Sequence, residues 1–84
     1  MAGYHLREIK RGVFGEASKI TEEHEEFLES LEQQNPVMAL VELSDLIGAI
    51  EAYVVRHHKI SLDELINMKN ATQRAFTNGS RSNR

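Results

Sequence analysis

Carboxylate side chains give residues 22–45 the clearest potential for chemistry. Six glutamates fall within residues 22–32, and two further acids, Glu42 and Asp45, stand in an otherwise apolar run. Oxygen ligands without histidine or cysteine suit a hard cation, so the pattern favours Mg²⁺ first and Mn²⁺ second. The sequence alone leaves open whether the acids gather around a cation or only form a solvated helix face.

Four of the acids form two pairs with the same spacing. Glu23 and Glu26 are three residues apart, and so are Glu42 and Asp45, which places each pair on one face of a helix. Two like charges about 4 Å apart repel each other by about 4 kcal/mol at an effective dielectric constant of about 20. Four carboxylates in one cleft therefore require a cation or raised pKa values.

The two groups of acids have different neighbours in the sequence. Glu42 and Asp45 are flanked by apolar residues, which favours a binding site over a solvated surface for this pair. For the other acids of the first group a solvated helix face is the better interpretation, with Glu22 as the first exception to consider. These other acids, outside the pair of Glu23 and Glu26, are Glu22, Glu25, Glu29 and Glu32.

The segment that carries the first group is predicted to be a helix over residues 18–34. Its apolar residues recur at helical spacing, and no glycine or proline interrupts them. Ser18 and Thr21 are the two candidates for its N-cap. The glutamates of the first turns then lie where the helix dipole favours negative charge.

Asn35 and Pro36 mark a sharp boundary between two helices. The residue before proline avoids the helical region, whereas proline suits the first turn of a new helix, so Asn35 should cap a second helix over residues 36–58. This segment is apolar on most sides, and we expect it to be buried on most sides. Because the break is so short, the two helices should fold back as an antiparallel hairpin.

The rest of the chain extends this hairpin to an all-α fold. A third helix is predicted over residues 61–78, where Ser61 and Glu64 form a capping box. Residues 79–84 are expected to be a loose tail. Residues 1–17 form an N-terminal arm, for which a short helix and an irregular segment remain equally open.

Length and composition limit the class of protein. With 84 residues the chain is expected to be one domain with a thin core, which self-association would supplement. The chain has no cysteine, which excludes thiol chemistry and favours an intracellular compartment. No apolar run approaches the roughly 20 residues of a membrane span, and no secretory signal is visible. We therefore expect a cytoplasmic protein without a membrane partner.

Charge is unevenly distributed along the chain. Residues 20–55 hold nine acids and no lysine or arginine, whereas both flanking segments are net basic. An acidic middle between basic ends suits a metal bound at the centre of a site with anionic oxygens at its rim, although solvated charge blocks are also common. The bases we consider for binding phosphate are Lys19, Lys69, Arg74 and Arg81.

The motifs ITEEHEEF and ALVELSDLIGAI resemble the paired E-E-x-x-E and E-x-x-D motifs of MazG-like nucleotide pyrophosphohydrolases. This all-α superfamily includes dimeric dUTPases and dCTP pyrophosphatases. The resemblance covers residues 16–55, and both motifs agree with the family in order, spacing and apolar frame. The residues that occupy family positions are Lys19, Glu22, Glu23, Glu26, Glu42 and Asp45.

The resemblance implies a function and a set of site residues. The family hydrolyses nucleoside triphosphates between the α and β phosphates, giving the monophosphate and pyrophosphate, so the expected substrates are dNTPs or non-standard NTPs. By the same resemblance, Mg²⁺ would be bound by Glu23, Glu26, Glu42 and Asp45. Glu22 would be an auxiliary acid that orients water or a second ion, and with Glu23 and Glu26 it forms the expected catalytic group.

The resemblance also implies an assembly. Two or more chains would pair through their apolar helix faces, as a dimer or a dimer of dimers, to form a four-helix bundle around the sites. Two other classes of function remain open. A helical interaction module could retain the acids without turnover, and a nucleic-acid binder could use the third helix with its basic tail. The nine acids argue against the latter.

Small side chains lie beside the second acid pair. Gly48 is one turn beyond Asp45, with Ala49 and Ala52 close to it. They would leave room for a ligand, and close packing of another helix explains them equally well. Tyr53 and Phe14 are most simply core or interface residues, and either of them could also stack on a nucleobase.

Overall fold

The computed structural model describes residues 7–77 of the chain. This part forms three α helices and no strand: α1 (Ala17–Glu32), α2 (Pro36–His58) and α3 (Leu62–Thr77). The all-α prediction is confirmed, and each helix boundary lies within two residues of the predicted one. The predicted tail of residues 79–84 is outside the described residues. None of the three helices, as far as they are described, combines the length and hydropathy of a membrane-spanning segment.

The first turn of α1 is not capped as predicted. The residue before the helix is Glu16, which makes no side-chain capping hydrogen bond, so the prediction of Ser18 or Thr21 as N-cap is wrong. The Ser18 hydroxyl instead accepts a hydrogen bond from the backbone N–H of Val13 at 3.0 Å. Glu16 N–H donates to the Val13 carbonyl at 2.9 Å. Contacts with the preceding arm therefore hold the start of α1.

A tight turn joins α1 to α2. Gln34 is in the left-handed conformation with φ of 57°, and its N–H donates to Leu31 while that of Asn35 donates to Ser30. These two bonds form a Schellman motif, which satisfies the last carbonyls of α1. The Asn35 side chain accepts from the Met38 N–H at 3.0 Å, which confirms the predicted cap of α2.

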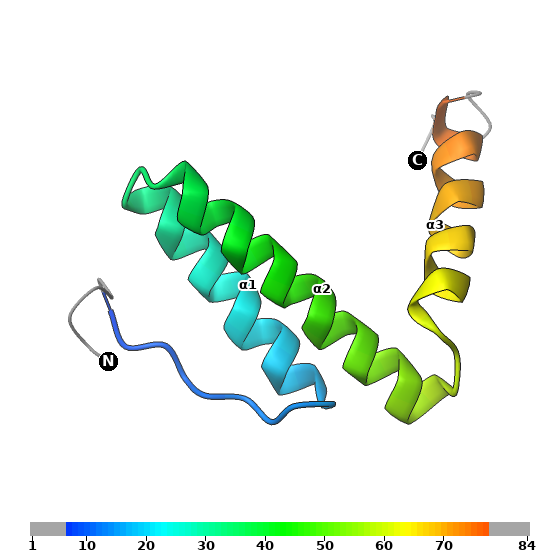
Figure 1. The fold of residues 1–84 in the computed structure, drawn as a ribbon, viewed down its shortest axis with the longest axis horizontal. Coiled ribbons are helices and arrows are strands. Elements are labelled where there is room, and N and C mark those ends of the chain that lie inside the picture. Colours follow the sequence, from blue (N-terminus) through cyan, green and yellow to red (C-terminus); the bar gives the residue numbers. More distant parts are fainter. Residues whose placement is uncertain (1–6, 78–84) are drawn as a thin grey trace.

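The two helices form the predicted antiparallel hairpin, and the N-terminal arm runs beside it (Figure 1). Of the two alternatives for the arm, the structure shows the irregular one over residues 7–16. Arg7 anchors the arm to the far end of α1, since its backbone N–H donates to Glu29 Oε2 at 3.1 Å and its guanidinium donates to Glu32 at 2.7 Å. The arm therefore covers part of the face of α1 that carries the glutamates.

The third helix stands away from the hairpin (Figure 1). The predicted capping box is confirmed, because Ser61 N–H donates to Glu64 Oε1 at 2.8 Å and Glu64 N–H donates to Ser61 Oγ at 3.1 Å. Lys59, with φ of 58°, ends α2 and redirects the chain. Within the described part, α3 contacts α2 and not α1.

The prediction that α2 is buried on most sides is wrong for the single chain. Only one side of α2 packs against α1, and its buried apolar residues are Ala39, Ala49 and Val54. Large apolar side chains on its other sides are exposed, namely Val37, Leu40, Val41, Leu43, Ile47 and Val55. The reason is geometric: a hairpin offers α2 one partner helix, whereas its apolar surface extends around most of its circumference.

Candidate metal centre

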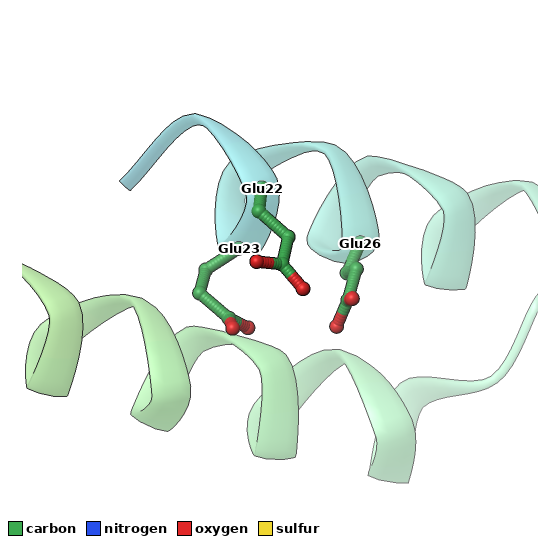
Figure 2. Close-up of side chains that lie close together, drawn as sticks. All are labelled: Glu22, Glu23 and Glu26. Carbon is green, nitrogen blue, oxygen red and sulfur yellow. The ribbon is translucent and has the colours of Figure 1, made fainter. Parts of the chain in front are cut away.

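Carboxylates occupy the space between α1 and α2 where a helical hairpin usually places apolar side chains. Glu22, Glu23 and Glu42 are all buried, and Glu23 and Glu42 are each only 5% exposed. Figure 2 shows the side chains of Glu22, Glu23 and Glu26 directed from α1 toward α2. Burying ionised carboxylates is unfavourable without compensating partners. The charges of these buried side chains must therefore be compensated by neighbouring groups, by protonation or by a cation.

The carboxylates form two groups that share Glu23. In each group, one oxygen of every member lies within 4.8 Å of the others. The first group is Glu22, Glu23 and Glu26, and the second is Glu23, Glu42 and Asp45. The facing arrangement expected from the two spacings is thus present in the structure. The register follows from the short turn, which allows Glu42 on α2 to return to the level of Glu23 and Glu26 on α1.

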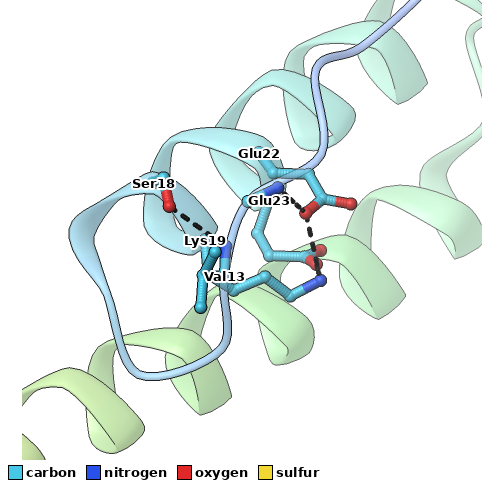
Figure 3. Close-up of polar contacts among 6 residues, drawn as sticks. Val13, Ser18, Lys19, Glu22 and Glu23 are labelled. Atoms are coloured by element: carbon cyan, nitrogen blue, oxygen red, sulfur yellow. Dashed lines mark hydrogen bonds and ion pairs between the residues drawn. The ribbon is translucent and has the colours of Figure 1, made fainter.

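Lys19 is the basic side chain that touches these acids. Its ammonium group lies 2.8 Å from Glu23 Oε2 and 3.2 Å from Glu22 Oε1, as Figure 3 shows. The hydrogen bond to Glu23 raises the pKa of Lys19, in spite of its partial burial, and Glu22 adds to the effect. Lys19 therefore stays charged and offsets part of the negative charge of the cluster.

Glu22 is held in place by the arm. The Gly12 N–H donates to Glu22 Oε1 at 2.9 Å, and Lys19 donates to the same oxygen at 3.2 Å. Burial opposes ionisation of Glu22, but these two bonds outweigh it, so the pKa of Glu22 lies below its usual value. The contact of Gly12 with Glu22 could not be predicted, because a backbone donor from an irregular segment leaves no periodic signal in the sequence.

Glu26 is an acid of this cluster with a raised pKa. Burial, a hydrogen bond with Glu42 and the charges of Glu23, Glu42 and Glu22 together raise the pKa of Glu26 to about 7. This is the raised pKa expected when several carboxylates share one cleft without enough positive charge. A divalent cation would displace this proton, since metal-bound carboxylates are deprotonated.

Glu23 supplies the observation that tests whether a cation fits. One of its oxygens, Oε2, is paired with Lys19, whereas Oε1 is buried and has no hydrogen-bond partner among the described residues. A buried carboxylate oxygen that lacks a partner is costly, and Glu23 is the residue that belongs to both groups of acids. The donor set is entirely oxygen, which is the chemistry that Mg²⁺ and Mn²⁺ prefer. These residues therefore fit a hard divalent cation.

The interpretation of the remaining acids as a solvated face is correct for Glu25 and Glu32 and wrong for Glu29, and Glu22 is the exception that was expected. Glu25 and Glu32 are exposed, whereas Glu22 and Glu29 are buried, Glu29 to 3% exposure. The physical reason is the arm, whose backbone donates to Glu29 through Arg7 and to Glu22 through Gly12. Helical periodicity does not reveal the path of such a segment.

Of the bases considered for phosphate binding, the structure brings one to the acids. Lys19 lies in the cluster, as described above. Lys69 and Arg74 are exposed on α3, which extends away from the hairpin (Figure 1), and the Lys69 ammonium donates to Gln73 at 3.4 Å. Arg81 lies outside the described residues.

Comparisons of the chain with protein families, with curated proteins and with solved structures find no match.

Proposed function

We propose that this chain is a Mg²⁺-dependent nucleotide pyrophosphohydrolase of the MazG-like type. Its substrates would be nucleoside triphosphates, in particular dNTPs or non-standard NTPs, and its products the monophosphate and pyrophosphate. The observation that carries the proposal is the convergence of Glu23, Glu42 and Asp45, with Glu26 beside them, between α1 and α2. The motif resemblance supplies the class of reaction.

The proposed ligands of Mg²⁺ are Glu23, Glu26, Glu42 and Asp45. Such an ion neutralises charge on bound phosphates and lowers the pKa of a coordinated water. Mn²⁺ has similar preferences and should substitute for it. Asp45 is the exposed member of the set, so the phosphates would approach from its side, where the site is open to solvent.

Glu22 is the proposed auxiliary acid. Gly12 and Lys19 both bind its Oε1, which leaves the carboxylate ionised and fixed in direction. An ionised, oriented carboxylate can accept a proton from water as the water oxygen attacks the α phosphorus. The bond between the α phosphorus and the bridging oxygen breaks, and pyrophosphate leaves with the electron pair. Lys19 is placed to bind phosphate oxygens at the same edge of the site.

We further propose that the functional unit is a dimer or a dimer of dimers, built as a four-helix bundle from two hairpins. The exposed apolar residues of α2 support this, since Val37 and Leu40 are 71% and 70% exposed. The described part buries few apolar side chains for its length, and association would cover the rest.

The direct test is a panel of NTPs and dNTPs incubated with the protein and Mg²⁺ and assayed for pyrophosphate. We expect pyrophosphate and the nucleoside monophosphate in equal amounts from at least one nucleotide, and none in EDTA. Release of inorganic phosphate alone would show that the protein cleaves a bond other than the one between the α and β phosphates. Tight Mg²⁺ binding without any turnover across the panel would favour a non-catalytic interaction module instead.

A further inference from the structure

The three glycines that the structure describes differ in what the fold requires of them. Gly15 has φ of +91°, a conformation that favours glycine. Gly12 approaches α1 so closely that a Cβ would overlap the backbone of Ser18. Gly48 stands inside α2, where a Cβ would meet nothing within 4 Å. Alanine is the better helix former, so folding of the single chain gives no reason for a glycine at position 48.

The open space beside Gly48 belongs to a cavity between the arm and α2 that is open to solvent along much of its surface. The cavity has a volume of about 380 Å³, which falls within the range of about 300–1,000 Å³ that is usual for ligand pockets. Phe14 and Gly15 line it from the arm, and Gly48, Ala52 and Val55 line it from α2. Phe14 is an exposed residue, 69% accessible to solvent, and it is the aromatic residue of the lining.

An ion pair and a hydrogen bond join the two walls of this cavity. Glu16, next to the arm residues of the lining, lies 3.3 Å from the Arg56 guanidinium and 3.1 Å from His57 Nε2. A Cβ on Gly15 would lie 3.1 Å from the Arg56 side chain, which shows how closely Arg56 packs on the arm. The cavity is therefore formed by the fold before any ligand binds.

The cavity adjoins the candidate metal centre. Gly48 is three residues beyond Asp45 on α2, so the two lie on the same side of the helix about one turn apart. Asp45 is in turn grouped with Glu23 and Glu42. A molecule that binds the cation through phosphates at Asp45 would extend its other end along α2 toward Gly48.

We propose that this cavity binds the nucleoside part of the nucleotide, with the base stacked on Phe14 and with Gly48 providing the space. The assignment rests on the proposed function. Apolar walls and an aromatic face suit a nucleobase of any kind, because every base has a π face. Glu51 and Arg56, which also line the cavity, offer an acceptor and donors to the polar edges of the base and sugar.

The test uses the amide resonances of Gly15 and Gly48 in the full chain. Non-hydrolysable α,β-imido analogues of the common dNTPs are added with Mg²⁺, and tripolyphosphate with Mg²⁺ serves as the ligand that lacks a nucleoside. We expect both ligands to shift the resonances of the acid cluster and only the nucleotide analogues to shift Gly15 and Gly48. Two results would overturn the cavity assignment and leave the proposed function standing. In the first, both ligands shift the two glycine resonances equally. In the second, neither ligand shifts them although the acid cluster responds. No response of the acid cluster to any ligand would overturn both.

A variant distinguishes between two possible occupants of the cavity. One is the nucleoside, and the other is a helix of a second copy of the chain packed on Gly48. Gly48→Leu fills the cavity, and Ala71→Leu adds a side chain of the same size at an exposed position of α3. We expect Gly48→Leu to bind the nucleotide analogues at least about tenfold more weakly than the parent. Its affinity for tripolyphosphate and its mass by light scattering should be unchanged. Ala71→Leu should match the parent in all three measurements. A lower mass for Gly48→Leu, or an unchanged affinity for the nucleotide analogues, would overturn the assignment.

Discussion

The ammonium group of Lys19 lies 2.8 Å from Oε2 of Glu23, one turn further along α1. The pair is largely shielded from solvent, with Glu23 5% exposed. A positive side chain inside a cluster of carboxylates competes with any cation that binds the same oxygens. Lys19 therefore has two opposing effects on the proposed site, since it weakens binding of the metal and strengthens binding of phosphate.

Substitution of Lys19 should separate these two effects. We expect Lys19→Met to bind Mg²⁺ alone about tenfold more tightly, because about 1.4 kcal/mol of charge repulsion is removed. The same variant should bind tripolyphosphate more weakly in the presence of Mg²⁺. Both affinities are measured by titration calorimetry, with Lys10→Met, at an exposed position of the arm, as the control. Weaker binding of Mg²⁺ by Lys19→Met would contradict the competition.

Removal of one proposed ligand should abolish turnover without unfolding the chain. Glu42→Gln keeps the size of a 5% exposed side chain and removes its charge, so we expect pyrophosphate release to fall at least about 100-fold. Asp45→Asn should behave in the same way. Glu25→Gln, at an exposed position of α1, is the control for Glu42→Gln. Equal activity of Glu42→Gln and the parent would place the site elsewhere.

Stability in EDTA should decrease as pH rises. The pKa of Glu26 is about 7 in the folded chain, against 4.5 for the ordinary side chain, so the folded state holds a proton that the unfolded state has lost. Its contribution to the free energy of unfolding is complete below about pH 4.5 and is lost as pH rises to about 7. We expect a decrease of roughly 1–3 kcal/mol between about pH 5 and about pH 8. Glu22, with its lowered pKa, acts in the opposite direction at lower pH.

Urea unfolding over this pH range provides the measurement. Glu26→Gln should remove most of the dependence, since its side chain does not titrate. Mg²⁺ should restore stability at the alkaline end, where the carboxylates are ionised and bind it most tightly. A parent chain whose stability is flat between these pH values in EDTA would contradict the raised pKa of Glu26.

Gly12 should be necessary for the position of the arm. A Cβ at this residue would overlap the backbone of Ser18, so Gly12→Ala must displace the arm from α1 and break its hydrogen bond to Glu22. We expect a loss of roughly 1–3 kcal/mol in the free energy of unfolding and a higher pKa for Glu22, measured by NMR titration of its carboxyl carbon. Arg11→Ala, at the exposed neighbouring position, should change neither quantity. An unchanged Glu22 pKa in Gly12→Ala would show that the arm does not orient this carboxylate.

The exposed apolar side of α2 should determine the state of association. We expect the parent to have at least the mass of a dimer by light scattering, and Leu40→Glu to be a monomer at micromolar concentration, because a charge at a buried interface is strongly unfavourable. Asn70→Glu adds the same charge at an exposed position of α3 and should retain the mass of the parent. A monomeric parent would contradict the proposed bundle.

The sequence predicted those parts of the fold that depend on local signals. Asn35 and the Ser61–Glu64 capping box act within four residues, so the starts of α2 and α3 could be inferred to within one residue. The start of α1 depends instead on the arm, through the bond between Val13 and Ser18. The proposed N-caps failed because this contact brings an irregular segment back onto the helix.

The distinction between local signals and contacts with the arm also applies to the positions of the acids. Spacing and the short turn were sufficient to bring Glu23 and Glu42 to the same level of the hairpin. Burial of Glu22 and Glu29 could not be inferred, because it depends on the path of the arm and on backbone donors at Gly12 and Arg7. The exposure of one side of α2 could not be inferred either, since an apolar pattern does not say whether its partner surface lies in the same chain.

The three-residue turn between α1 and α2 has a consequence for the order of folding. Closing so short a loop loses little chain entropy, and contacts between adjacent helices form early in folding. We therefore expect the carboxylates of the two helices to come together when the hairpin forms, before α3 packs against α2. Their mutual repulsion acts at the folding transition state, so divalent cations and mild acidity should accelerate refolding of this hairpin.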